Sequence, residues 1–156
     1  MHIAFVASAV PRRCGIATFT GDLRAAIKAA DPTVHCYAAA IDEPSAERAY
    51  GIDVRWRIRQ EDASSYAAAA EAISESRVDI VNVQHEFGLY GLWHDGAYDD
   101  HLRVFLEHCT KPVVVTLHTV PEVEYDGRYH MYDNSLSAIY TLCDGQTIAG
   151  VEDIGA

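Results

Sequence analysis

Short runs of apolar residues alternate along the chain with segments in which apolar residues recur every three or four positions. This alternation predicts βαβ units, whose strands form a parallel sheet. The expected strands cover residues 3–7, 34–40, 54–59, 78–83, 112–117 and 146–149. The expected fold class is therefore α/β, a three-layer Rossmann-like domain with a mostly parallel sheet flanked by helices.

The first expected helix begins near Ala17 or Thr18 and runs for about a dozen residues. Its apolar face consists of four residues at helical spacing, which are Phe19, Leu23, Ile27 and Ala30. The helix is expected to end at Asp31, because the following Pro32 disfavours a helical conformation in the residue before it.

Further helices are expected at residues 64–76, 97–108 and 131–142, with Asp62 or Ser64 as the N-cap of the first of these. Residues 54–59 alternate apolar and cationic side chains, which predicts a strand near a sheet edge with one buried face. The runs 78–83 and 112–117 are rich in β-branched residues and are expected in the middle of the sheet, covered on both faces.

With 156 residues, of which 49% are hydrophobic and 22% charged, the chain has the composition of one globular domain over residues 1–156. The formal charge of −11 disfavours nucleic acid as a partner, because Lys and Arg must neutralise its phosphates. Local clusters still leave room for a small anion, and these contain Arg12 and Arg13, and Arg55, Arg57 and Arg59.

The cysteines show neither a CxxC pair nor a regular spacing, which indicates reduced thiols, and they are Cys14, Cys36, Cys109 and Cys143. The N-terminus lacks the basic segment and the long apolar segment of a signal peptide. No stretch reaches the roughly 18–20 apolar residues of a membrane-spanning helix. We therefore expect a cytoplasmic protein, with a peripheral membrane contact left open.

Ligands of an open parallel sheet bind outside the carboxyl ends of its strands. The first such loop, residues 8–16, leads into a helix N-terminus, where unpaired N–H groups and the helix dipole favour an anion. Gly15 would allow close approach of the backbone, and Arg12 and Arg13 add charged donors. Neither GxGxxG nor GxxxxGK[ST] is present, so a purely structural Gly15 with solvated arginines is an equal alternative.

The second loop, residues 84–96, places His85 and Glu86 at the end of a buried strand, and the third, residues 117–127, begins with Leu117 and His118. Histidine and glutamate at such positions fit acid–base catalysis or hydroxyl recognition. Hydrogen bonding to the loop backbone is the structural alternative. Two histidines at equivalent strand ends favour a functional role.

His94, His101 and His108 recur at seven-residue spacing. Zinc ligands on one helix usually stand four residues apart, as in HExxH, whereas residues seven apart are separated by about 10 Å along the axis. We therefore expect a solvated helix face here and no metal site.

Four segments together resemble the N-terminal domain of a GT-B glycosyltransferase of family 4. They are MHIAFV with PRRCGIATF (residues 1–6 and 11–19), VQHEFG (83–88) and VTLHT (115–119). The resemblance covers essentially the whole chain. It implies one half of a GT-B fold, in which two Rossmann-like domains face each other across a cleft, the N-terminal one mainly binding the acceptor and the other the nucleotide sugar.

The resemblance also implies retaining transfer of a mannose- or glucose-like hexose from a nucleoside diphosphate sugar, with no metal and no other cofactor. The implied catalytic residues are His118, near the anomeric carbon, and His85 and Glu86, on the acceptor side. The implied substrate- or phosphate-binding residues are Gly15, Arg12, Arg13, Gly88 and Thr119.

The residues that hold the donor in this family belong to a C-terminal domain that this sequence lacks. We therefore expect the isolated chain to have little or no transferase activity and to require that domain or a partner chain. One alternative is a non-catalytic half-size domain that binds carbohydrate or forms a homodimer. Another is a small hydrolase that uses His85, Glu86 and His118, with Glu122 or Glu124 as a second carboxylate.

Overall fold

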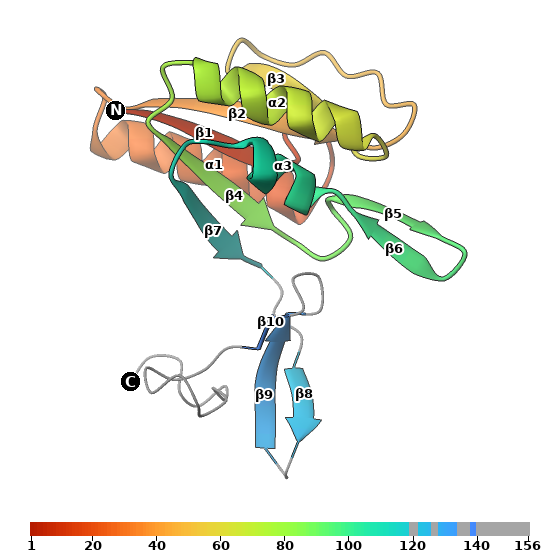
Figure 1. Cartoon of the computed structure of the whole chain (residues 1–156). Helices are drawn as coiled ribbons and strands as arrows, with labels where there is room; N and C mark the ends of the chain where they lie inside the picture. The colour runs from red at the N-terminus through yellow and green to blue at the C-terminus, as the bar shows by residue number, and fades with distance from the viewer. Residues whose placement is uncertain (119–121, 126–127, 134–137, 140–156) are drawn as a thin grey trace. The chain divides into compact units, whose positions relative to one another are not determined.

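The computed structural model describes residues 1–118, 122–125, 128–133 and 138–139 (Figure 1). By its internal contacts the chain divides into two compact units, Met1–Leu117 and His118–Ala156. The expectation of one domain over residues 1–156 stays a prediction.

The first unit contains a five-stranded parallel sheet with the order β3-β2-β1-β4-β7 (Figure 1). Its strands are β1 (His2–Ala7), β2 (His35–Asp42), β3 (Val54–Arg59), β4 (Ile80–His85) and β7 (Val113–Leu117). Its helices are α1 (Gly15–Ala30), α2 (Ala63–Glu75) and α3 (Leu102–His108). The expected α/β class with a Rossmann-like sheet is confirmed.

The side chains of β1 alternate between two cores, one on each face of the sheet. Ala4 and Val6 belong to the larger core, which contains side chains of α2 and α3. Ile3 and Phe5 point to the opposite face, where Ile27 of α1 packs against their cluster. Figure 1 shows the same arrangement, with α1 on one side of the sheet and α2 and α3 on the other. This alternation makes β1 the buried centre of the sheet.

The helix α1 begins at Gly15, slightly before the expected start, and its N-cap is Cys14, whose Sγ accepts a hydrogen bond from the Ala17 backbone nitrogen. The expected apolar face is confirmed at Leu23 and Ile27, which pack against the core, but was wrong at Phe19, which is 44% exposed, and at Ala30, which is also exposed. The buried positions of α1 are instead Ala17 and Thr20. Small side chains at these positions let the helix approach the sheet closely, which turns the larger Phe19 outward.

The helix α2 confirms Asp62 as its N-cap, because the Asp62 carboxylate accepts a 2.9 Å hydrogen bond from the Ser64 backbone nitrogen. The expectation for β3 is also confirmed. This strand lies at one edge of the sheet, with Ile58 buried and Arg55 and Arg57 exposed.

The expected helix over residues 97–108 was wrong in its first part. Residues 97–100 form β6 (Ala97–Asp100), which pairs with β5 (Gly91–His94) in an antiparallel hairpin. Asp95 and Gly96 connect the two strands with φ angles of 49° and 83°. An Asp-Gly pair with both φ angles positive is a favoured two-residue hairpin turn, and this local preference overrides the helical spacing around it.

The position expected for residues 112–117, in the middle of the sheet, stays a prediction, because the strand expected at 146–149 lies outside the described residues. The strand β7 lies at the end of the described sheet, not in its middle. Val114 is 48% exposed and Val115 is 41% exposed. A β-branched run predicts a strand, but it carries no information on which strands flank it.

The described part of the second unit contains β8 (Glu122–Tyr125), β9 (Arg128–Asp133) and β10 (Ala138–Ile139). They pair in an antiparallel manner in the order β10-β9-β8. The expected helix over residues 131–142 was therefore wrong for residues 131–133 and 138–139, which are extended. The strand expected at 146–149 lies outside the described residues. No helix in the described part of the chain is long and apolar enough to cross a membrane.

Candidate functional site

The strand order reverses beside β1. The chain passes from β1 through α1 to β2 on one side, and later returns through α2 to β4 on the other side. The loops that leave the carboxyl ends of β1 and β4 therefore flank the switch point, where open parallel sheets bind their ligands. Two of the three predicted loops, those with Gly15 and with His85, lie at this position.

Gly15 is the first residue of the 16-residue helix α1. A Cβ atom added to Gly15 would meet no heavy atom within 4 Å, so the packing of the chain does not require a glycine there. The adjacent Arg13 is exposed, and the described residues give its guanidinium no ion pair. Because a helix N-terminus presents unpaired N–H groups, the open space over Gly15 suits an anionic or hydroxyl group of a ligand.

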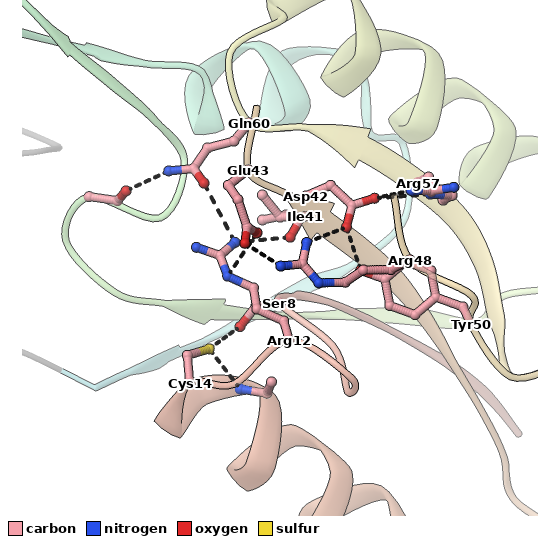
Figure 2. A network of polar contacts seen from close by, with 12 residues as sticks. Ser8, Arg12, Cys14, Ile41, Asp42, Glu43, Arg48, Tyr50, Arg57 and Gln60 are labelled. Atoms are coloured by element: carbon pink, nitrogen blue, oxygen red, sulfur yellow. Dashed lines mark hydrogen bonds and ion pairs between the residues drawn. The ribbon is translucent and has the colours of Figure 1, made fainter. Parts of the chain in front are cut away.

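Arg12, in contrast, is engaged by protein groups and only 19% of its side chain is exposed. Its Nη1 donates to the carbonyl oxygen of Ile41 at 3.1 Å and to Oε1 of Gln60 at 3.5 Å (Figure 2). Its Nε lies 3.3 Å from the carboxylate of Glu43. Arg12 thus connects the β1–α1 loop to the carboxyl ends of β2 and β3. Its predicted contact with phosphate stays a prediction.

A charged network surrounds Asp42 at the end of β2 (Figure 2). The Asp42 side chain is only 6% exposed, and it accepts hydrogen bonds from Nε and Nη2 of Arg57 at 2.9 and 2.7 Å. Arg48 donates to the same carboxylate at 3.3 Å and also to Glu43, and the Tyr50 hydroxyl donates to Asp42 as well. Two guanidinium groups offset the cost of burying this carboxylate.

The network sets the protonation states of Glu43 and Tyr50. The hydrogen bond from Arg48 lowers the pKa of the Glu43 carboxyl, with a further contribution from the charge of Arg12. Burial, followed by the hydrogen bond to Asp42, raises the pKa of Tyr50 to about 12. At neutral pH, Glu43 is therefore an anion and Tyr50 is a neutral hydrogen-bond donor.

The sequence analysis missed this network. Asp42 directly follows a buried apolar run, as His85 does, so the criterion applied to His85 would also have found Asp42. Arg48 and Tyr50 lie in the segment between β2 and β3, which carries no motif. Nothing in their spacing indicates that they meet Asp42.

An open cavity of about 830 Å³ lies at the carboxyl ends of β2 and β3. Charged side chains of both signs line it, and these include Glu43, Glu47, Glu61, Asp62, Arg57 and Arg59. Carboxylates accept hydrogen bonds only, and guanidinium groups donate only. A wall with both kinds of group suits a ligand that has many hydroxyl groups, because each hydroxyl both donates and accepts.

Gln60 holds the loop that follows β4 in place. Its Nε2 donates to the carbonyl oxygens of Gly88 and Gly91, both at 2.9 Å. Gly88 has a φ angle of +85°, which side chains other than glycine rarely adopt. Gly88 therefore has a backbone role, and its predicted contact with substrate stays a prediction.

His85 belongs to the packed end of β4. It is 3% exposed, and its ring stacks on that of Tyr90 with the centroids 6.0 Å apart. The Tyr90 hydroxyl lies 3.1 Å from the carbonyl oxygen of Val6 and 2.9 Å from that of Gln84, which joins β1 to β4. Glu86, directly after the strand, is partly buried. The catalytic roles of His85 and Glu86 stay predictions.

The third predicted loop begins at the end of β7. The register of the sheet pairs Leu117 with His85, so these two strands end together. His118 follows Leu117, is partly buried and is the first residue of the second unit. Its catalytic role stays a prediction, and Thr119 lies outside the described residues.

The three histidines with seven-residue spacing do not share a helix face, contrary to expectation. His94 lies on β5, His101 precedes α3 and packs its ring against Tyr66 at 5.5 Å, and His108 is in the last turn of α3. Within the described residues, no group of three or more His, Cys, Asp or Glu side chains is placed to hold a metal ion.

The site thus consists of the open α1 N-terminus, the Asp42 network with its cavity, and the β4–β5 loop. Its geometry suits a polar ligand at the carboxyl edge of the sheet. In comparisons with known proteins, no family model, no curated protein and no solved structure matches this chain.

Proposed function

We propose that this chain is the acceptor-side half of a retaining GT-B glycosyltransferase, which transfers a hexose from a nucleoside diphosphate sugar. The observation that carries the proposal is the open space over Gly15, at the N-terminus of α1 and beside the switch point of the sheet. A donor diphosphate or a sugar hydroxyl fits there, because the helix N-terminus supplies unpaired N–H donors. The sequence motifs around Gly15, His85 and His118 support the same assignment.

We assign the acceptor to the cavity at the ends of β2 and β3. The carboxylate of Glu61 accepts hydrogen bonds from acceptor hydroxyls, and Nη1 of Arg57 donates to them, since Nε and Nη2 of Arg57 are bonded to Asp42. By the resemblance, His85 and Glu86 line the acceptor side. His118 contacts the transferred sugar near its anomeric carbon.

A second domain or a partner chain completes this enzyme. Transfer requires stabilisation of the charge that develops on the departing diphosphate. Arg12 is already paired with Glu43 and with the Ile41 carbonyl, which leaves Arg13 and the α1 N-terminus to meet that charge. These are insufficient, so the isolated chain is expected to bind ligand without transferring sugar. Transfer by the purified 156-residue chain alone would contradict this point.

We place the reaction in the cytoplasm, with no cofactor besides the donor substrate. The free thiols of Cys14, Cys36 and Cys109 support a reducing compartment.

A titration followed by NMR tests the proposal. Inorganic pyrophosphate and the UDP-, GDP- and ADP-hexoses are added to the chain, and the amide signals of residues 15–17 are followed. We expect saturable shifts at these amides that are lost in Gly15→Ala. Gly51→Ala is the matched control, because a Cβ at Gly51 also meets no atom within 4 Å, and it should bind like the unmodified chain. Equal binding by Gly15→Ala would refute the assignment.

A second candidate is a carbohydrate-binding domain without catalysis. The engagement of Arg12 by protein groups favours it, because the loop then offers less positive charge to a diphosphate. This candidate predicts binding of oligosaccharides that Gly15→Ala does not change, together with no response to any nucleoside diphosphate sugar.

A further inference from the structure

An aromatic cluster on the β5–β6 hairpin adjoins the site described above. Trp93 of β5 and Tyr98 of β6 are direct cross-strand partners, so both side chains lie on the same face of the hairpin. Phe87, from the loop after β4, completes the cluster. In Figure 1 the hairpin extends away from the sheet and helices of the first unit. We call Phe87, Trp93 and Tyr98 the hairpin triad.

The rings of the hairpin triad touch one another. The centroid distances are 5.4 Å for Phe87–Tyr98, 5.6 Å for Trp93–Tyr98 and 6.0 Å for Phe87–Trp93. These are contact distances for aromatic pairs. The triad therefore does not enclose a space between its rings, as a cage for a cation would, and any ligand must bind on its outer surface.

Trp93 supplies that outer surface, since it remains 59% exposed although it is one of the largest apolar side chains. The rings of Phe87 and Tyr98 pack against the Trp93 ring and hold it in place. A ligand that stacks on the indole therefore removes apolar area from water without first having to order the side chain.

The charge around the triad restricts the ligand. The β4–β5 loop and the hairpin, residues 86–101, contain no Lys or Arg, and their acidic residues are Glu86, Asp95, Asp99 and Asp100. Such a surface repels phosphate groups, nucleic acids and anionic lipids. It suits an uncharged ligand that combines an apolar face with hydroxyl groups, since carboxylates form strong hydrogen bonds with hydroxyl donors.

We propose that the hairpin triad is a platform on which the ring of a neutral carbohydrate stacks. One face of a pyranose ring presents C–H groups to the indole of Trp93, while the hydroxyls at the ring edge meet the surrounding carboxylates. The choice of carbohydrate rests on the proposed function. Because Phe87 directly follows Glu86 in the loop after β4, the platform extends the candidate acceptor region outward along an oligosaccharide.

The fluorescence of Trp93 tests this proposal directly. The chain has two tryptophans, so Trp56→Phe leaves Trp93 as the only tryptophan, and excitation at the red edge of the absorption band selects it over the tyrosines. Titration of Trp56→Phe with maltotriose and mannotriose is expected to change the Trp93 emission saturably with at least one of them. No change up to millimolar sugar would overturn the proposal. A change caused by zwitterionic phosphatidylcholine vesicles and not by either sugar would overturn it as well.

Binding measured by calorimetry gives a second test. We expect Trp93→Ala to bind the responsive sugar about tenfold more weakly, and Trp93→Tyr to retain most of the affinity. Ile52→Ala is the matched control, because Ile52 is 82% exposed and lies outside the hairpin, and it should bind normally. Unchanged affinity in Trp93→Ala would contradict the platform. A dimer seen by sedimentation would also contradict the platform if it were lost in Trp93→Ala and no sugar bound. Trp93 would then contact a second copy of the chain.

Gly15→Ala separates this inference from the proposed function. It should leave the Trp93 response unchanged, because Gly15 lies at the N-terminus of α1 and is not part of the hairpin triad. A response at Trp93 without any binding of nucleoside diphosphate sugar keeps the platform and removes the transferase. Binding of the nucleotide sugar without a response at Trp93 removes the platform and keeps the transferase.

Discussion

The Nη1 atom of Arg12 donates a 3.1 Å hydrogen bond to the carbonyl oxygen of Ile41. This bond joins the loop after β1 to the end of β2. With the Gln60 and Glu43 contacts of the same guanidinium group, it makes Arg12 a connection between three strand ends. Its neighbour Arg13 is exposed, so two adjacent arginines have different surroundings.

This difference predicts unequal effects of two substitutions. Arg12→Ala should lower the free energy of unfolding by about 1–3 kcal/mol, because it leaves the Ile41 carbonyl without its donor and Glu43 with one cation fewer. Arg13→Ala should change stability by no more than about 0.5 kcal/mol, as is usual for exposed positions. Urea unfolding of both variants measures the difference. Equal effects would contradict the structural role of Arg12.

The elements that the sequence predicted well are those whose pattern is local. The strands β1 and β3, the Asp62 cap of α2 and the end of α1 before Pro32 follow from alternation, capping and backbone sterics. The place of β7 at the end of the described sheet does not follow from a local pattern, because tertiary packing decides which strands are neighbours. The β5–β6 hairpin was missed because the helical spacing was given more weight than the Asp95-Gly96 turn.

For the candidate site too, the sequence predicted the features with a local pattern and missed those that depend on tertiary packing. The carboxyl ends of β1 and β4 could be located because chemistry-bearing residues directly follow apolar runs there. The contact of Arg12 with Gln60, and those of Asp42 with Arg48 and Arg57, join segments that are separate in the sequence. Such contacts depend on the order of the strands, which a single sequence does not provide.

Glycine at position 91 is predicted to be indispensable for the hairpin. A Cβ at Gly91 would lie 1.5 Å from the carbonyl oxygen of Asp99, which is backbone and cannot rotate away. Gly91→Ala should therefore cost about 3 kcal/mol or more in unfolding free energy, the upper range for overpacking. Gly96→Ala should cost about 1 kcal/mol, because only its φ of +83° is unfavourable for alanine.

Thermal and urea unfolding of the two glycine variants, with Gly51→Ala as a control without close contacts, give the order of effects. The amides of the hairpin should lose hydrogen-exchange protection first in Gly91→Ala. A Gly91→Ala protein as stable as Gly51→Ala would contradict the close approach of the Asp99 carbonyl oxygen to Gly91.

Gln60 is predicted to order the loop that carries Glu86 and Phe87. Gln60→Leu keeps a similar volume but removes the donor to the Gly88 and Gly91 carbonyls, so it should cost about 1–3 kcal/mol. Gln60→Glu should be at least as destabilising, because a carboxylate cannot donate. Hydrogen exchange of residues 86–91 should become faster in both variants, and unchanged protection there would contradict this role.

The phenol of Tyr50 predicts a specific loss of stability at high pH. Burial and the hydrogen bond to Asp42 raise the pKa of Tyr50 from 10.0 to about 12 in the folded protein. A group whose pKa is higher in the folded state stabilises fully below its unfolded pKa and loses this contribution as the pH rises. The contribution of Tyr50 is thus constant near neutral pH and disappears between pH of about 10 and 12.

Tyr50→Phe removes both the hydrogen bond and the titration. The unfolding free energy of the unmodified chain should exceed that of Tyr50→Phe by a constant amount from pH 7 to pH 9, since the phenol is neutral in both states over that range. The two curves should then converge above the unfolded pKa of 10.0. Burial also raises the pKa values of Tyr66, Tyr90 and Tyr98, but these tyrosines are common to both proteins and cancel in the difference. Urea unfolding at each pH measures the curves, and curves that stay parallel above pH 10 would show that burial and Asp42 do not raise the pKa of Tyr50.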